Sequence, residues 1–199
     1  MLRESKRYEN ISKDIIDIYL DYNIKGFPLD EIDICNKLGV SLVPYSSYVE
    51  SKEGIELLVK QSEYSFFVKA SSETSPTIYY NDFIASAEVK RFSIFHELKH
   101  YIYNEDSRYE DEDDLAEFFA RYFLCPIPYL IMKGIDSENE IISHFGVTYT
   151  VACNVISNIR SRKQWHGCSI FDHEIPLLKQ LDKDAYDVFS SIIEGGDVF

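Results

Sequence analysis

The segment Phe95–His100, with the sequence FHELKH, constrains this chain more than any other because its spacing suits a metal site. In a helix, His96 and His100 project from one face, one turn of about 5.4 Å apart. Two imidazoles so placed can bind one zinc ion, and a catalytic site commonly adds a carboxylate and leaves a position for water. Glu97 is expected to take a proton from that water, whose pKa zinc lowers to roughly 7. The motif therefore predicts hydrolysis of a peptide bond.

A chance match on a surface helix is the alternative interpretation, with odds on the order of 1% for a chain of this histidine content. The flanking residues argue against it. Ile94, Leu98 and Ile102 recur every four residues, with Phe95 beside them, so the helix is expected to pack in a core. Two His and a Glu on a half-buried helix need partners, which a metal site would supply.

Length and charge narrow the classes of protein. The chain has 199 residues, enough for one domain, or one domain with an appendage, and for a sizeable core. A net charge of −14 disfavours nucleic acid as a partner, because phosphate binding depends on Lys and Arg. A protein partner is expected instead. No apolar run approaches the ~18 residues of a membrane span, so we expect a soluble protein.

The cysteines indicate a reducing compartment. They are far apart, without paired CxxC spacing, and no secretory segment precedes them. We expect them to be reduced, mostly in the core of a cytoplasmic protein. The four positions are Cys35, Cys125, Cys153 and Cys168.

Periodicity and turn residues predict an α+β fold. We expect a small, mostly antiparallel sheet packed against helices. The predicted helices cover 10–23, 28–38 with Pro28 first and Gly39 as the stop, and a segment from near Ser86; the predicted strands cover 40–45, 64–70 and 77–80. Because Ile78–Tyr80 runs directly into the His-Glu helix, we expect the edge of the sheet nearest the metal site to hold an extended peptide as a further strand.

A second apolar helix over 115–124 is expected to supply the missing ligand. It follows an acidic run and shows a stripe with two small alanines, Ala116 and Ala120, which would allow another helix to approach closely. Asp113 and Glu117 lie on the same stripe. One of them is expected to bind the metal, and the other to orient a ligand His through its free ring N–H.

Over roughly Tyr8–Arg162, the chain resembles the ImmA/IrrE family of zinc-dependent metallo-endopeptidases. Three blocks in the same order carry the resemblance: Ile78–Asp82, Arg91–Tyr101 and Ala116–Pro126. Members of that family cleave a repressor protein encoded beside them and so relieve transcriptional repression. The resemblance implies that the partner here is a DNA-binding repressor of a phage, mobile element or stress regulon.

The resemblance also assigns residues, with departures. The family's third ligand is usually a Glu three positions before the first Ala of the second helix, followed four residues later by Asp or Asn; here those positions hold Asp113 and Glu117. Asp113 is expected to be the ligand if the helices approach more closely, and Glu117 otherwise. Lys99 replaces a common Gly and is expected to face solvent, or else to bring positive charge to the site.

The C-terminal third is predicted to be helical. Residues 139–162 have the outline of a helix-turn-helix with a turn at Gly146 and a small basic end, and an acidic tail closes the chain. Such outlines are also ordinary packing units, and the acidic chain disfavours DNA. We expect a zincin-like domain over 1–135 and a helical extension over 136–199.

The sequence thus predicts zinc held by His96, His100 and Asp113, with Glu97 as general base and later proton donor. The oxyanion partner stays open among four tyrosines: Tyr79, Tyr80, Tyr101 and Tyr103. The rival hypothesis is a non-catalytic regulator that keeps the fold and binds a repressor or DNA through its C-terminal helices, and the swapped acid pair is the feature that favours it.

Overall fold

The computed structural model of the protein describes residues 2–49, 51–104 and 110–194. The chain divides into two compact units, one of residues 29–124 and one of residues 1–28 with 125–199. The acidic residues of 105–109 and the tail beyond 194 lie outside the described residues. The domain boundary expected after residue 135 stays a prediction.

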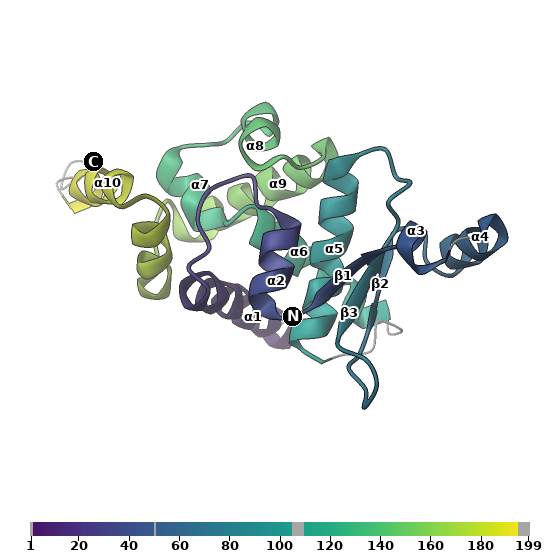
Figure 1. The fold of residues 1–199 in the computed structure, drawn as a ribbon. Coiled ribbons are helices and arrows are strands. Elements are labelled where there is room, and N and C mark those ends of the chain that lie inside the picture. The colour runs from purple at the N-terminus through teal and green to yellow at the C-terminus, as the bar shows by residue number, and fades with distance from the viewer. Residues whose placement is uncertain (1, 50, 105–109, 195–199) are drawn as a thin grey trace. The chain divides into compact units, whose positions relative to one another are not determined.

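The unit of residues 29–124 holds a small sheet and the two helices that carry the site (Figure 1). Its elements are α2 (Glu31–Leu38), β1 (Ser41–Pro44), α3 (Tyr45–Tyr48), α4 (Lys52–Gln61), β2 (Ser65–Val68), β3 (Thr77–Tyr80), α5 (Ala87–Ile102) and α6 (Glu110–Leu124). The three predicted strands and the two site helices are confirmed. Helix α4, which carries no buried residue, was not predicted.

The sheet has the order β1-β3-β2, which corrects one expectation. It is mixed rather than mostly antiparallel, because β1 pairs with β3 in parallel and β2 pairs with β3 antiparallel. The segment Ile78–Tyr80 lies in the central strand, and the expectation that a peptide adds at the edge nearest the metal site stays a prediction. The α+β class itself is confirmed, and the edges of the sheet are β1 and β2.

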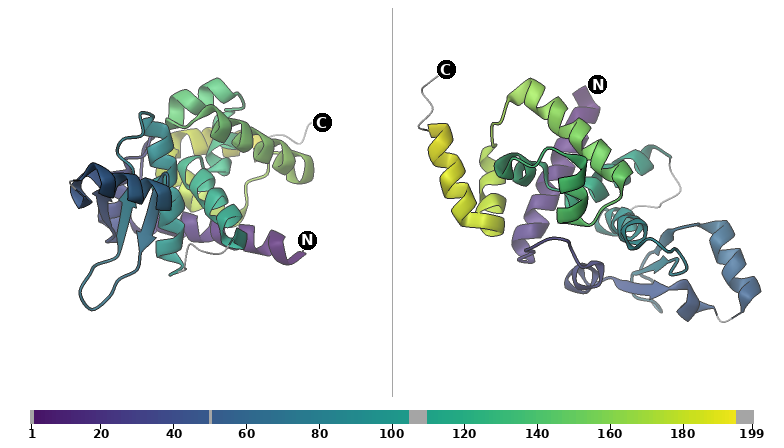
Figure 2. Two further views of the ribbon diagram at one scale, coloured as in Figure 1. Left: turned by 90° about the vertical axis from the view of Figure 1, so that its right-hand side faces the viewer. Right: turned by 90° about the horizontal axis from the view of Figure 1, so that it is seen from above.

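Helix α5 covers one face of the sheet (Figures 1 and 2). Ser86 caps its N-terminus by accepting the N–H of Val89, as the sequence predicted for a start near residue 86. Its residues Ile94 and Leu98 are fully buried, and Ile78 of β3 is buried on the facing side of the sheet. Because the predicted apolar side of α5 packs on the sheet, the His pair has to project from another face of the helix.

Helix α6 packs along α5 and contributes aromatic side chains to the same core. Ala116 and Ala120, the two small residues of the predicted stripe, are completely buried. Phe123 lies with its ring centroid 5.1 Å from that of Phe95 on α5. The small residues allow close approach while the aromatic residues fill the space beyond them, so the start of α6 is held next to α5.

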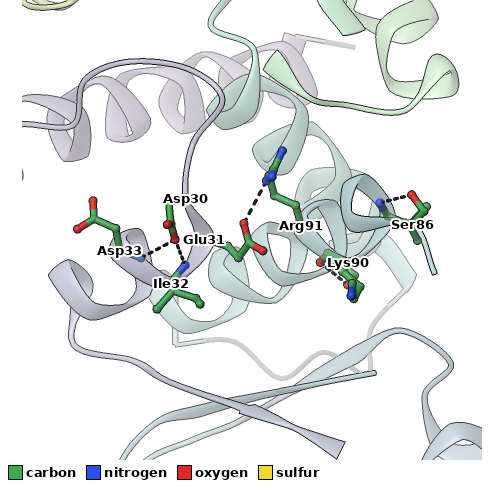
Figure 3. Close-up of polar contacts among 9 residues, drawn as sticks. Asp30, Glu31, Ile32, Asp33, Ser86, Lys90 and Arg91 are labelled. Carbon is green, nitrogen blue, oxygen red and sulfur yellow. Dashed lines mark hydrogen bonds and ion pairs between the residues drawn. The ribbon is translucent and has the colours of Figure 1, made fainter. Parts of the chain in front are cut away.

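Helix α2 is tied to α5 by an ion pair (Figure 3). The side chain of Asp30 caps α2 by accepting the N–H groups of Ile32 and Asp33, so the helix begins at Glu31 rather than at Pro28 as expected. Arg91 Nε lies 3.1 Å from Glu31 Oε2. The predicted stop at Gly39 is confirmed, since this residue adopts the left-handed conformation with φ of 78°.

The second unit is entirely helical in its described residues (Figure 2). Its elements are α1 (Leu2–Asp21), α7 (Ile127–Lys133), α8 (Glu138–Phe145), α9 (Tyr149–His166), the 3₁₀ turn η1 (Asp172–Glu174) and α10 (Ile175–Glu194). The predicted helix, turn and helix over 139–162 correspond to α8 and α9, with Gly146 in the left-handed conformation between them. Phe27 packs against Phe145 and Tyr129 in the core of this unit.

A buried ion pair stabilises the end of α9. Both nitrogens of the Arg162 fork donate to the carboxylate of Glu174 at 2.6 Å, and the side chain of Glu174 is 2% exposed. The exposed pair of Lys133 and Asp182 in the same unit provides a matched control.

We expect Glu174→Ala to lower the free energy of unfolding by about 3–5 kcal/mol, because it leaves the guanidinium of Arg162 buried without its carboxylate. Asp182→Ala removes the solvent-screened pair and the cap that Asp182 gives to Ala185, so we expect about 1–2 kcal/mol. Urea unfolding followed by circular dichroism measures both. Equal losses for the two variants would contradict a special role for the buried pair.

Two further expectations concern the cysteines and the membrane. Cys35 and Cys125 are buried, Cys153 is half-buried and Cys168 is exposed, and all four are free thiols. The described residues contain one stretch long and apolar enough to cross a membrane, Asp113–Lys133, of which 83% is buried inside the protein. Core helices of soluble proteins share that composition, so the stretch is weak evidence for a membrane span.

Candidate metal centre

The structure brings together the three predicted ligands. Nitrogen atoms of His96 and His100 and a carboxylate oxygen of Asp113 all lie within 4.8 Å of one another. The two imidazoles come from successive turns of α5, and the carboxylate comes from the first turns of α6. The apolar packing between these helices is therefore what brings the carboxylate to the imidazoles.

The distances show how closely the ligands already converge. His96 Nε2 lies 3.2 Å from Asp113 Oδ1, and the ring centroids of His96 and His100 are 5.4 Å apart. Ligand atoms that share one zinc ion are about 3.4 Å apart, given bonds of about 2.1 Å in tetrahedral geometry. The observed spread is close to that value, and small side-chain rotations would complete it.

Exposure increases across the group. His100 is fully buried, the side chain of His96 is 19% exposed, and that of Asp113 is 66% exposed. Burial lowers the pKa of His96 below its ordinary value, and the carboxylates of Asp113 and Glu117 oppose that shift. The neutral imidazole is the form that binds a metal ion, so burial prepares His96 for this role. The exposed side of Asp113 faces solvent.

Glu97 is held at the edge strand β2. The backbone N–H of Phe67 donates to its carboxylate, and the hydroxyl of Ser65 lies 3.5 Å from Oε1. Burial raises the pKa of Glu97 to about 8, with the charge of Asp113 acting in the same direction and the two donors opposing. Oε2 is buried and has no hydrogen-bond partner among the described residues.

The unpartnered Oε2 of Glu97 bears on whether this group of residues fits a metal ion. A buried carboxylate oxygen without a donor is costly in a folded protein. Two imidazoles and one carboxylate are the donor set of a catalytic zinc site, and an acid beside them with one unsatisfied oxygen suits a group that receives a proton there. The residues present therefore fit a divalent metal such as zinc.

Glu117 is not part of the converging group. Its Oε2 accepts from Arg121 Nη1 at 2.8 Å, and its side chain is 53% exposed. It remains close enough for its charge to raise the pKa of His96. The geometry thus favours Asp113 over Glu117 as the third ligand, while the role of Glu117 in orienting a histidine stays a prediction.

Lys99 corrects a further expectation, because it does not face solvent. It is 1% exposed, and its Nζ lies 5.7 Å from the centroid of the Tyr103 ring. Its charge contributes to the lowered pKa of His96. The second expectation for Lys99, positive charge near the site, therefore holds.

Among the tyrosines proposed as oxyanion partners, the structure places two elsewhere. The hydroxyl of Tyr101 donates to the carbonyl of Leu38 at 2.8 Å. Tyr79 stacks on Phe66 and contacts Tyr48 on the face of the sheet away from α5. Neither residue faces the three ligands, so the choice among the remaining tyrosines stays open.

The sequence did not identify the groups that hold Glu97. Ser65 is 6% exposed, and its one hydroxyl proton is shared between the carbonyl of Ser93 on α5 at 3.1 Å and the longer contact with Glu97. A small polar residue within the apolar segment Tyr64–Val68 was the available signal. The contact from Phe67 comes from the backbone, and no residue type reveals such a contact.

Comparison with known proteins is consistent with this geometry. The family model described as the IrrE N-terminal-like domain, a peptidase family, matches residues 51–157, more than half of the chain. No curated protein and no solved structure matches the chain significantly. The match contains the His pair, Glu97 and the whole of α6. The chain therefore belongs to the ImmA/IrrE family of metallopeptidases.

Proposed function

We propose that this protein is a cytoplasmic, zinc-dependent endopeptidase that cleaves a protein substrate. The observation that carries the proposal is the convergence of His96, His100 and Asp113 within 4.8 Å, with Glu97 on the helix that carries both histidines. Family membership supports a metallopeptidase. Zinc is the metal that this donor set suits best.

Each side chain has a role that follows from its position. His96, His100 and Asp113 would hold the ion, which when bound polarises a carbonyl and acidifies water. In its carboxylate form, which a bound cation would favour by lowering the raised pKa of Glu97, the side chain would accept a proton from the attacking water through its unpartnered Oε2 and later return it to the leaving amine. Phe67 N–H and Ser65 restrict the movement of the carboxylate, so the free oxygen is the one available for proton transfer.

The edge strand β2 supports a peptide as the substrate. It is an outer strand of the sheet, and the N–H of Phe67 points away from β3 toward Glu97. An extended segment that added to β2 would run past Glu97, with its main chain held by hydrogen bonds rather than by particular side chains. The edge of β2 lies against Glu97, so it is the one at which the sequence-based expectation of an added strand would apply.

The substrate that we propose is a DNA-binding repressor of a phage, mobile element or stress regulon. Family membership suggests this class, and the charge of the chain favours it, because a net charge of −14 attracts a basic protein. Association should weaken as salt rises and screens that attraction.

Chelation tests the proposal. The protein is mixed with a repressor-like protein encoded beside it, with zinc, and the products are identified by mass spectrometry. We expect two fragments that disappear after treatment with a chelator and return when zinc is added. Cleavage that persists in excess chelator would contradict a metal-dependent mechanism.

The second candidate is a non-catalytic regulator that binds a repressor or DNA. The observation in its favour is α9, which has no acidic residue in an otherwise acidic chain and carries Arg160, Arg162 and Lys163 near its end. Arg162 is engaged by Glu174, which leaves less charge for phosphate. Tight binding of a repressor by the zinc-loaded protein, without any cleavage, would favour this candidate.

A further inference from the structure

Apolar side chains form a stripe on the face of the sheet that α5 does not cover. Side chains alternate between the faces of a strand, so Tyr64, Phe66 and Val68 share one face. Tyr64 is 46% exposed and Val68 is 37% exposed, while Phe66 is half-buried. The ladder with β3 extends to Tyr64, whose carbonyl accepts the N–H of Asn81 at 2.8 Å. We call Tyr64, Phe66 and Val68 the β2 stripe.

Neighbouring aromatic rings widen this surface. The ring of Tyr79 on β3 stacks on Phe66 with centroids 5.1 Å apart, and Tyr48 of α3 meets Tyr79 at 4.7 Å. Tyr48 is 56% exposed. Three exposed apolar side chains around two half-buried rings form an apolar patch rather than scattered single residues, and such patches mark interaction sites.

The edge of β2 is short, but its side chains do not protect it against pairing. Natural edge strands carry charged residues, proline or a bulge that prevents a further strand from adding. The sequence of β2, Ser65–Val68, contains neither a charged residue nor proline, and its register with β3 is regular across all four residues. The outward N–H of Phe67 donates to Glu97 and the outward carbonyl of Ser65 accepts the Ser62 hydroxyl, so an added segment would pair with the other outward backbone groups of β2.

The two faces of β2 would meet different side chains of an added strand. Ser65 and Phe67 face α5, since Ser65 donates to Ser93 and the ring of Phe67 packs on Tyr101. Side chains of the added strand opposite these residues would lie on the side of Glu97. Those opposite Phe66 and Val68 would lie on the β2 stripe, because paired positions share a face.

We propose that the β2 stripe, with Tyr79 and Tyr48, is a specificity surface that binds apolar side chains at every second position of the segment that adds to β2. The proposal rests on the proposed function, because its occupant is the extended segment of a protein substrate. The proposal adds a rule for substrate selection. Side chains of the segment that lie on the β2 stripe are apolar, and this surface does not restrict the alternate side chains, which lie on the side of Glu97. The main chain would set affinity, and the stripe would set sequence preference.

Binding is measured separately from cleavage by using the full chain with Glu97→Gln, so that retained peptides stay intact. The probe is a degenerate library of decapeptides, and the retained peptides are sequenced. The stripe variant adds Tyr64→Ser and Val68→Thr, both exposed positions that should not affect folding. The control adds Ile32→Ser, an apolar residue on α2 that is 57% exposed.

We expect apolar residues at alternate positions to be enriched about tenfold over the library, to fall toward background with the stripe variant, and to persist with Ile32→Ser. No enrichment, enrichment without alternation, or an unchanged pattern with the stripe variant would overturn the proposal. The wild-type protein is assayed for cleavage of the same library. Alternation in binding without any cleavage would reject the proposed peptidase function and support the specificity surface. Cleavage without alternation would support the peptidase function and reject the specificity surface.

Discussion

Glu97→Gln is expected to reduce the rate of substrate cleavage by about 10³-fold, because the amide cannot accept a proton from the attacking water. The substitution keeps the size of the side chain, so the contacts with Phe67 N–H and Ser65 should still fix its position. Single-turnover cleavage of the repressor, followed by gel electrophoresis, measures the rate. Zinc content, measured by mass spectrometry of the metal, should equal that of the wild type.

The control for this prediction is Ser65→Ala, which removes the weaker of the two donors. We expect a loss of less than about tenfold, since a hydroxyl at 3.5 Å contributes little compared with the backbone N–H. A Glu97→Gln protein that cleaved at the wild-type rate would remove Glu97 from the mechanism. Unchanged cleavage with Ser65→Ala would leave that role intact.

Asp113→Ala is expected to weaken zinc binding by more than about 100-fold, since even partners outside the ligand set typically contribute 10–100-fold. The side chain of Asp113 is 66% exposed, so its removal should hardly change stability. Competition with a colorimetric chelator measures the affinity for zinc, and thermal unfolding of the metal-free protein checks the fold.

Glu117→Ala is the matched control, because Glu117 is also acidic, lies one turn further along α6 and is similarly exposed. We expect its affinity for zinc to stay within about tenfold of the wild type. The opposite order of the two effects would transfer the third-ligand role to Glu117. That transfer would require the carboxylate to leave Arg121.

The sequence predicted the part of the site in which residues able to bind a metal or transfer a proton recur at the spacing of a helix. His96, His100 and Glu97 lie in one short motif, and the period of a helix fixes their directions. The preference for Asp113 over Glu117 depended on the family resemblance, because helical periodicity alone places both residues on one stripe of α6. The structure separates them through Arg121, which binds one carboxylate and leaves the other beside His96.

The fold was predictable at the level of elements and less so in their pairing. Capping residues such as Ser86 and Gly39 marked helix ends through local hydrogen bonding. The parallel pairing of β1 with β3 depends on contacts between segments far apart in the chain, so no local pattern revealed it. Lys99 shows the same limit, since its burial follows from tertiary packing rather than from its residue type.

X-ray absorption spectroscopy of the protein with one equivalent of zinc tests the central claim most directly. We predict one bound zinc with two imidazole nitrogens and carboxylate and water oxygens at about 2.0–2.2 Å, and no sulfur ligand. The imidazole signal should fall by half in His100→Ala. A shell that contains sulfur, a spectrum unchanged by His100→Ala, or failure to bind zinc would contradict a shared metal site on α5 and α6.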